Sequence, residues 1–250
     1  MRKGIVAGLT VLVIAVIAWA GNDPWRSKPF TEWTDQDIQK VFTDSPWARK
    51  VTIEGTWKPV MGVDAAGGEI SAAGNGGGGG SKGIGGGSTV LPAEADLASG
   101  TRGPNVQFDV YWMSSETMRA ALARRAMLHS GKTQEEVQKY VDTPADTYQI
   151  VVQGADLAPF YHDDEKFFAA NSSLEIKKTK QKIQPTHVIY NRDPQNKITS
   201  AVFEFPKKAN GQDTIPPTEK NVEFSVKLGK STLYAEFDPS KMVNQKGPDL

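Results

Sequence analysis

The chain has 250 residues, with 29 basic and 29 acidic side chains, three histidines and no cysteine. A length of this order allows one large domain or two small ones. Balanced charge argues against a general nucleic-acid binder, which normally carries a clear basic excess. The lack of cysteine excludes disulfides, thiolate metal sites, iron–sulfur clusters and thioester chemistry.

Residues 1–20 have the pattern of a signal peptide. A short positive region precedes an uncharged run, residues 4–20, that is rich in Val, Ile, Leu and Ala. The run closes on Ala18-Trp19-Ala20, with small residues at the two positions that signal peptidase reads. An uncleaved membrane anchor is the alternative, because an uncharged run of this length can span a bilayer. Both alternatives predict an exported protein, periplasmic or extracellular, or anchored to the inner membrane.

Residues 21–62 are expected to form an N-terminal unit of an arm, a short helix and a strand. The arm, residues 23–31, is rich in proline and aromatic side chains and is expected to be extended. Thr34 is a candidate N-cap because Asp37 follows three residues later, and an apolar stripe then predicts a short helix. Apolar and polar residues alternate over residues 51–57, which predicts a half-buried strand.

Residues 63–104 form a glycine-rich stretch without any regular apolar pattern. A phosphate-binding loop would need a GxxxxGK[ST] motif between a strand and a helix, and Lys82 is followed by Gly83. The composition therefore predicts a long flexible loop rather than a phosphate site.

Residues 105–250 alternate between helical and strand patterns. Asp109 and Tyr111 share one face of the first predicted strand, opposite its apolar positions. A helix is predicted from Ser115 to a C-terminal cap at Gly131, and the capping box at residues 133–136 opens a second helix. An acidic and aromatic segment, 156–170, shows no clear period. The candidate strands are 106–112, 148–152, 174–182, 186–191, 198–205, 222–228 and 232–237.

These patterns predict an α+β fold with a mainly antiparallel sheet, two central helices, and an N-terminal helix–strand unit docked on the sheet. The unit at 21–62 is too small to bury a core alone. Its tryptophans Trp33, Trp47 and Trp57 must therefore pack on the body. We expect 21–62 and 105–250 to form one domain, with the glycine-rich loop inside it.

No motif in the sequence assigns chemistry to a residue. The cluster His162-Asp163-Asp164-Glu165 has adjacent residues that point in different directions, so it is better interpreted as a solvated turn than as a metal or acid–base site. No HExxH or GxSxG motif is present. We assign no catalytic, cofactor-binding or metal-binding residue, and we expect no cofactor.

Three other groups of residues have a functional and a structural interpretation. The lysine run near 177–182 could bind an anionic surface, but lysines that protect an edge strand are the favoured interpretation. The arginines of the first predicted helix are expected on a solvated face. The N-terminal aromatic side chains could stack on a sugar or a peptide, but are expected to dock the arm. The arginines are Arg119, Arg124 and Arg125, and the aromatic residues are Trp25, Phe30, Trp33, Trp47 and Trp57.

Two segments near the N-terminus, PFTEWTDQD at 29–37 and KVFTDSPWA at 40–48, resemble the opening of a family of uncharacterised exported proteins associated with acidobacteria and related soil bacteria. The resemblance continues in the helix at 118–125 and in the closing hairpin from Val222. The last residues, 244–250, depart from the lysine–leucine ending of that family. The resemblance implies an exported protein without an assigned activity, and it transfers no functional residue.

Three functional hypotheses follow. The first is an exported, non-enzymatic binding or interaction module of the cell envelope, whose partner is an envelope or extracellular protein or polymer. It would not bind nucleic acid, and it would contact a membrane only if residues 1–20 are uncleaved. The second is a secreted or periplasmic hydrolase that acts on an extracellular polymer through paired carboxylates. The third is a membrane-anchored scaffold or assembly factor. The hydrolase would draw its carboxylates from Asp109, Asp156, Asp163, Asp164 and Glu165.

Overall fold

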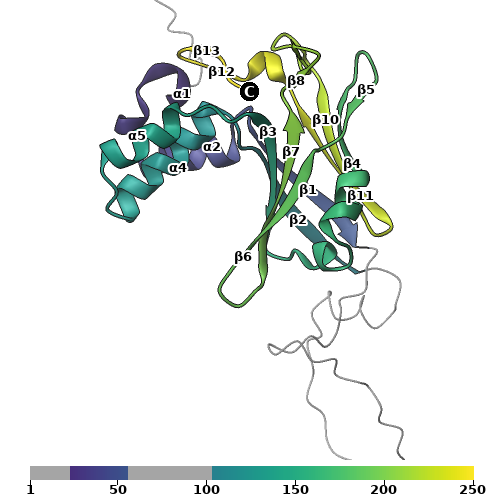
Figure 1. Cartoon of the computed structure of the whole chain (residues 1–250). Helices are drawn as coiled ribbons and strands as arrows, with labels where there is room; N and C mark the ends of the chain where they lie inside the picture. The colour runs from purple at the N-terminus through teal and green to yellow at the C-terminus, as the bar shows by residue number, and fades with distance from the viewer. Residues whose placement is uncertain (1–22, 56–102) are drawn as a thin grey trace, which may run out of the picture.

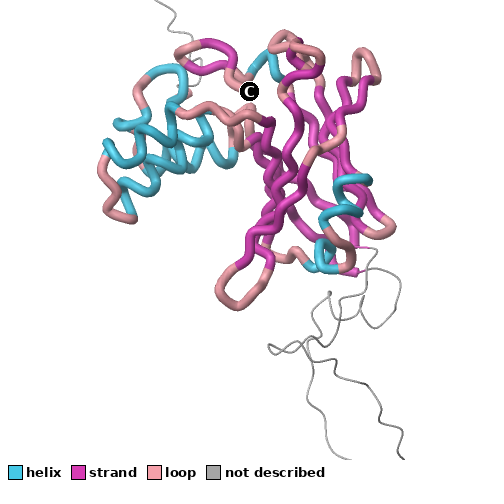
Figure 2. Tube along the Cα trace, in the orientation of Figure 1, coloured by secondary structure: helices cyan, strands magenta, loops and turns pink. Residues whose placement is uncertain are grey.

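The structure, a computed structural model, describes residues 23–55 and 103–250. Within these ranges two antiparallel sheets pack against each other, and a layer of helices lies to one side of the larger sheet (Figure 1). The helical part and the sheets are coloured separately in Figure 2. The predicted α+β class is confirmed. The leader at 1–20 and almost all of the glycine-rich range 63–104 lie outside the described residues.

The larger sheet has five strands in the described ranges, in the order β1-β2-β3-β7-β6, and every neighbouring pair is antiparallel. β1 and β6 are therefore its two edges. The strands are β1 (Ala48–Gly55), β2 (Gly103–Trp112), β3 (Thr147–Gly154), β7 (Ile198–Pro206) and β6 (His187–Arg192).

The smaller sheet, counted over the same described residues, has four strands in the order β11-β10-β4-β5. The predicted hairpin is confirmed as β10 and β11, which turn at Gly229 with φ of 59°. The strands are β11 (Ser231–Phe237), β10 (Val222–Leu228), β4 (Ser172–Ile176) and β5 (Gln181–Ile183). Two short hairpins pair β8 (Lys208–Ala209) with β9 (Gln212–Asp213), and β12 (Val243–Asn244) with β13 (Gly247–Pro248).

Aromatic side chains fill the space between the two sheets. The rings of Phe203 and Phe224 lie 5.1 Å apart, and those of Trp112 and Phe237 lie 5.3 Å apart, each pair with one partner from each sheet. All four side chains are buried. Removing an aromatic side chain of this size from water contributes about 1.5–3 kcal/mol. This layer joins the sheets in a chain that has no cysteine for a disulfide.

The helical layer begins with α1 (Pro24–Ser27), η1 (Phe30–Glu32) and α2 (Asp35–Thr43). The cap predicted at the start of α2 is confirmed: Thr34 Oγ1 accepts from the Asp37 amide at 3.3 Å, and Asp37 Oδ2 accepts from the Thr34 amide at 2.8 Å. The expectation of an extended arm at 23–31 was wrong, because α1 and η1 are helical turns. Pro24 is the first residue of α1, and Pro29 directly precedes η1. The fixed φ of proline suits the start of a helix.

The two central helices are α4 (Glu116–His129) and α5 (Gln134–Asp142). Ser115 caps α4 by accepting from the Met118 amide at 3.1 Å, and Gly131, with φ of 64°, follows its end. Thr133 forms the predicted capping box of α5. Both predicted helices are therefore confirmed, together with their ends.

The N-terminal unit docks on the body as the sequence predicts. β1 pairs with β2, and its other edge lies beside β11, where Arg49 donates to the carbonyl of Glu236. The ring of Phe42 in α2 packs edge-on against Tyr111 of β2, with 5.6 Å between the ring centres. A last helical turn, η3 (Pro239–Lys241), leads to the C-terminal hairpin β12–β13, which lies beside α1. Arg26 of the arm donates to the Lys241 carbonyl at 3.2 Å.

One sequence prediction in the body was wrong, and one segment without a sequence assignment is helical. The segment 156–170 contains η2 (Ala158–Tyr161) and α6 (Glu165–Ala170), which are too short to show a period in sequence. They carry Phe160 and Phe168, both fully buried. The single strand expected at 174–182 is a hairpin, because β4 ends at Ile176 and Lys180, with φ of 59°, turns the chain into β5.

Candidate functional site

The acidic cluster His162 to Glu165 lies at the start of α6. Asp164 is the N-cap of that helix and accepts from the Phe167 amide at 2.8 Å. His162, Asp164 and Glu165 are exposed, and Asp163 is half-buried. Over residues 23–55 and 103–250, no three histidine, aspartate or glutamate side chains gather in an arrangement that could hold a metal ion. The role that the structure shows for this cluster is the capping of α6 by Asp164.

The lysine run surrounds one carboxylate at the β4–β5 hairpin. Glu175 lies 3.6 Å from Lys177, 3.5 Å from Lys180 and 3.6 Å from Lys182. Burial raises the pKa of Glu175, but the three lysines outweigh that effect, and the pKa lies below its ordinary value. Since β5 is the edge of the smaller sheet, this arrangement favours edge protection over an anion-binding surface.

The arginines of α4 do not form the solvated face that the sequence predicts. Arg119 is 8% exposed, and its guanidinium donates to the carbonyls of Ser114 and Val141. Arg125, by contrast, is exposed, and its guanidinium carbon lies 4.4 Å from the ring centre of Phe42. The prediction failed because the sequence does not reveal which free carbonyls, such as that of Val141 near the end of α5, come to face α4.

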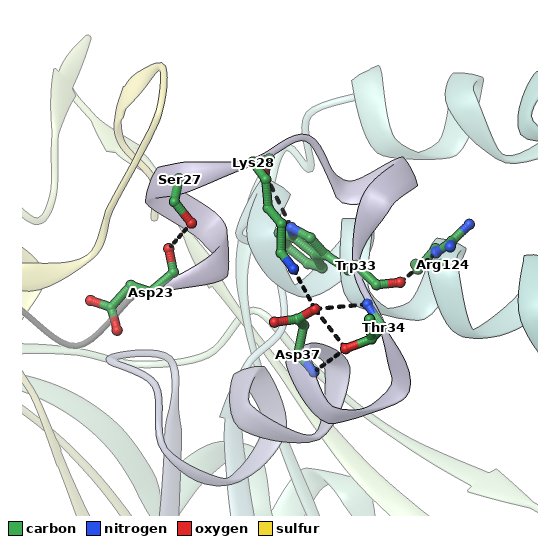
Figure 3. A network of polar contacts seen from close by, with 7 residues as sticks. All are labelled: Asp23, Ser27, Lys28, Trp33, Thr34, Asp37 and Arg124. Carbon is green, nitrogen blue, oxygen red and sulfur yellow. Dashed lines mark hydrogen bonds and ion pairs between the residues drawn. The ribbon is translucent and has the colours of Figure 1, made fainter.

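Polar contacts tie the arm to α2 and α4 (Figure 3). Lys28 Nζ lies 2.7 Å from Asp37 Oδ2, and the indole N–H of Trp33 donates to the Lys28 carbonyl at 3.2 Å. Arg124 Nε donates to the Trp33 carbonyl at 2.7 Å, so the helix also fixes the arm. The arm and the residues up to Trp33 are thus bonded to α2 through Asp37 and to α4 through Arg124.

The tryptophans of the arm region are buried rather than displayed. Trp25 and Trp33 are each 3% exposed and Trp47 is fully buried, and the rings of Trp25 and Trp47 meet edge-on at 5.6 Å. A stacking platform for sugars or peptides needs exposed ring faces. The burial therefore fits the docking interpretation. Phe30 is half-buried, and Trp57 lies outside the described residues.

The arm, α4, α5 and the C-terminal hairpin border a surface groove of about 290 Å³. The charged side chains of this groove have partners within the protein. Lys246 lies 2.6 Å from Glu116, and Lys28 is paired with Asp37. A ligand would have to break these ion pairs to use their charge, so this groove is a weaker candidate site than a second cavity on the larger sheet.

A second cavity, of about 260 Å³, lies between the helices and the outer face of the larger sheet. We call it the helix–sheet cleft. The sheet wall follows from strand register: Asp109 of β2 lies opposite Lys50 of β1 and Gln153 of β3. Cross-strand partners point to the same face of a sheet, so these three side chains form one polar row. The other lining residues are Tyr111 of β2, Met113 in the turn after β2, Gln39, Phe42 and Thr43 of α2, and Leu122 and Arg125 of α4.

Helical spacing builds the opposite wall. Gln39, Phe42 and Thr43 lie at i, i+3 and i+4 of α2, which places them on one face of that helix. Leu122 and Arg125 are three residues apart on α4 and face the same space. Two helices and three strands therefore direct side chains into one small volume.

The helix–sheet cleft is lined by polar side chains that differ in burial: Lys50 and Gln153 are exposed, and Asp109 is half-buried. Among the described residues, the side chains of Lys50, Asp109 and Gln153 have no hydrogen-bond or ion-pair partner, and neither does the hydroxyl of Tyr111. Tyr111 is only 8% exposed as a residue, but its hydroxyl is not a fully buried atom and reaches the solvent of the cleft. Burial, with a smaller effect of the Asp109 charge, raises the pKa of Tyr111 to about 12. The hydroxyl is thus protonated at neutral pH and can donate a hydrogen bond into the cleft.

The five carboxylates considered for hydrolysis do not meet in either cavity. Asp109 is the one acidic residue that lines the helix–sheet cleft, and Glu116 is the one that lines the arm groove. Asp156 is exposed and accepts from the Ala158 amide at 2.8 Å. Of the remaining three, Asp163 and Asp164 precede α6, and Glu165 is the first residue of that helix.

The remaining histidines are also on the surface. His129 Nε2 lies 2.7 Å from Asp35, at the end of α4, and His187 lies 3.7 Å from Glu204. The imidazole of each histidine is exposed and lies near one carboxylate. Neither lines one of the two cavities.

Sequence reasoning found Asp109 and Tyr111 on a shared face but missed Lys50, Gln39 and Gln153. The alternation of polar and apolar residues predicts which face of a strand a side chain occupies. It does not predict which strand will lie beside it, so these residues could not be grouped from the sequence. Within 23–55 and 103–250, no helix combines the length and apolar character needed to cross a bilayer. Comparison of the chain with protein-family models, with curated proteins and with solved structures gives no match.

Proposed function

We propose that this protein is an exported, non-enzymatic binding module, which holds one polar unit of an envelope or extracellular polymer in the helix–sheet cleft. The observation that carries the proposal is the set of cleft side chains without protein partners. Polar groups placed in a concave site fix the orientation of a ligand and give specificity. The signal-peptide pattern of residues 1–20 supports an exported location for that ligand.

Binding is favoured over hydrolysis because of the carboxylate count in the cleft. Glycoside hydrolysis by the common mechanisms needs two carboxylates, about 5–9.5 Å apart, on either side of the scissile bond. Asp109 is the one acidic residue in the lining. A single carboxylate can accept hydrogen bonds from a ligand, but it does not supply the acid–base pair.

The charges of the cleft agree with a small polar ligand rather than with nucleic acid. Its lining has two cationic residues, Lys50 and Arg125, beside Asp109. The whole chain has equal numbers of basic and acidic residues, whereas nucleic-acid binders carry an extended basic surface. A volume of about 260 Å³ is slightly below the range of typical ligand sites, which suits one unit of a longer molecule.

Ligand-observed NMR tests the proposal. The mature chain is screened against neutral, acidic and amino oligosaccharides and short peptides, and hits are repeated with Asp109→Ala and Gln153→Ala. The matched control is Gln107→Ala, since Gln107 is an exposed residue on the same strand outside the cleft. We expect at least one hit whose saturation transfer falls in both cleft variants and persists in the control. Hits that are equally strong in all four proteins, or no hit at all, would overturn the proposal.

Export is tested separately by N-terminal sequencing of the protein recovered outside the cytoplasm. A chain that begins at Gly21 supports cleavage after Ala20. A chain that still carries residues 1–20 supports the anchored alternative, and a protein that is retained in the cytoplasm contradicts both.

A further inference from the structure

We propose that the unit held in the helix–sheet cleft is an acidic sugar, a pyranose that carries a carboxylate beside its ring hydroxyls, as in polyuronate polysaccharides. This inference rests on the proposed function and names the ligand class of the same site. Three properties of the lining support it: an unpaired guanidinium, a set of groups suited to hydroxyls, and a small apolar surface.

Arg125 supplies the recognition of the carboxylate. Its guanidinium lies over the ring of Phe42 at 4.4 Å, and no acidic side chain of the described residues pairs with it. A cation on a ring face is oriented by that contact while its N–H donors stay available. The guanidinium fork matches a carboxylate bidentately, which a neutral sugar cannot exploit. Lys50 adds a second positive charge to the same lining.

Asp109, Gln39 and Gln153 supply groups for hydroxyls. An ionised carboxylate only accepts hydrogen bonds, and each amide both donates and accepts, which is the combination that neighbouring ring hydroxyls require. A ligand ammonium could also bind Asp109, as in an amino acid. Lys50, however, lies directly opposite Asp109 in the β1–β2 register and would repel an ammonium there. The lining therefore favours hydroxyls as the partners of Asp109.

Apolar side chains complete the site. Met113 and Leu122 line the cleft and are half-buried, so both retain some exposed surface. The C–H face of a pyranose ring is apolar and can cover such surface while its edge carries the hydroxyls. The size of the cavity, about 260 Å³, suits one such ring rather than a long segment of a chain.

Isothermal titration of the mature chain with trigalacturonate and with the neutral trisaccharide cellotriose tests the ligand class. We expect trigalacturonate to bind more tightly, and Arg125→Gln to weaken it about tenfold or more while cellotriose is little affected. Arg192→Gln is the matched control, because Arg192 is also an exposed arginine near aromatic rings but lies outside the cleft. Asp109→Asn should weaken both sugars, since it changes the hydroxyl partner.

The other outcomes separate this inference from the proposed function. If cellotriose binds as tightly as trigalacturonate and Asp109→Asn still weakens it, the acidic class is wrong and the cleft remains a binding site. If a free amino acid competes better than either sugar, the ligand class is again wrong. If Arg192→Gln weakens trigalacturonate as much as Arg125→Gln does, the binding is non-specific attraction and the inference fails. If neither sugar binds, the inference fails, and the broader ligand screen decides the proposed function.

Discussion

The indole N–H of Trp47 donates a hydrogen bond of 2.7 Å to the backbone carbonyl of Asp249, the residue before the last one in the chain. The carboxylate of Asp249 in turn accepts from the amides of Glu116 and Thr117, at 2.6 and 2.9 Å, where α4 begins. One C-terminal residue thereby joins the entry to β1 and the start of the central helix. Trp47 is fully buried and Asp249 is 7% exposed, so water does not compete for these bonds.

Asp249→Ala is expected to lower the free energy of unfolding by about 2 kcal/mol, because it leaves two amides at a helix start without their acceptor. Asp249→Asn keeps one acceptor oxygen and should cost about half as much. Urea unfolding followed by circular dichroism measures both. Gln245→Ala, in the neighbouring exposed turn, is the control. Equal midpoints for Asp249→Ala and the control would contradict the role assigned to this carboxylate.

Asp37→Asn is expected to destabilise the protein by about 1 kcal/mol at pH 7, because it weakens the start of α2 and the ion pair with Lys28. Burial raises the pKa of Asp37, but hydrogen bonds from Lys28 and Thr34 outweigh this, and the pKa lies below its ordinary value of 3.8. The unfolded chain therefore takes up the proton first as the pH falls.

It follows that the stabilisation from Asp37 is complete above about pH 5, where the unfolded carboxylate is also ionised, and is lost as the pH falls through the lower folded pKa. The difference between wild type and Asp37→Asn should accordingly shrink between pH 5 and pH 2 in urea unfolding. Asp44→Asn, at an exposed carboxylate after α2, serves as the reference. A difference that stays constant over this range would refute the assignment.

Arg119→Lys is expected to cost about 2 kcal/mol in the free energy of unfolding. The guanidinium reaches the carbonyls of Ser114 and Val141 at once, and a single ammonium cannot reproduce that geometry. Thermal and urea unfolding measure the loss. Arg192→Lys makes the same exchange at an exposed site and should change stability by less than about 0.5 kcal/mol. The two variants unfolding alike would mean that Arg119 contributes only packing.

Replacing residues 56–102 by a turn of about six residues is expected to stabilise the protein by about 2 kcal/mol. Gly55 and Gly103 are partners in the β1–β2 ladder, so a short connection can join the strands, and closing a loop about eight times shorter costs less entropy. A scrambled segment of the original length is the control and should leave the urea midpoint unchanged. A lower midpoint for the shortened chain would show that the segment contributes to the fold.

The helix caps and the hairpin turn were predicted correctly because they depend on residues close together in the sequence. Thr34, Ser115 and Thr133 start helices where the sequence places them, because a cap needs only the side chain and the amides of the next turn. Gly229 turns the β10–β11 hairpin for the same kind of reason, since few residues accept its positive φ. Such features depend on neighbours within a few positions.

The parts that the sequence did not predict depend on distant partners. Arg119 looks like any helical arginine until the end of α5 and the segment before α4 surround it. The polar row of Lys50, Asp109 and Gln153 exists only once β1, β2 and β3 are in register. Alternation could place Asp109 on a face, but the strand order and the position of α2 decide whether that face meets solvent or a cleft.

The contact between the arm and the C-terminal hairpin has a consequence for the order in which the chain folds. Arg26 bonds to the Lys241 carbonyl, and α1 lies beside β12, so the first described helix contacts the last described hairpin. Contacts between segments far apart in the sequence can form only after the later segment has been synthesised. The helix α1 therefore cannot reach its final position until Lys241 and the β12–β13 hairpin have been synthesised. Late docking of α1 agrees with the export proposed above, because a chain that crosses a membrane by that route does so before it folds.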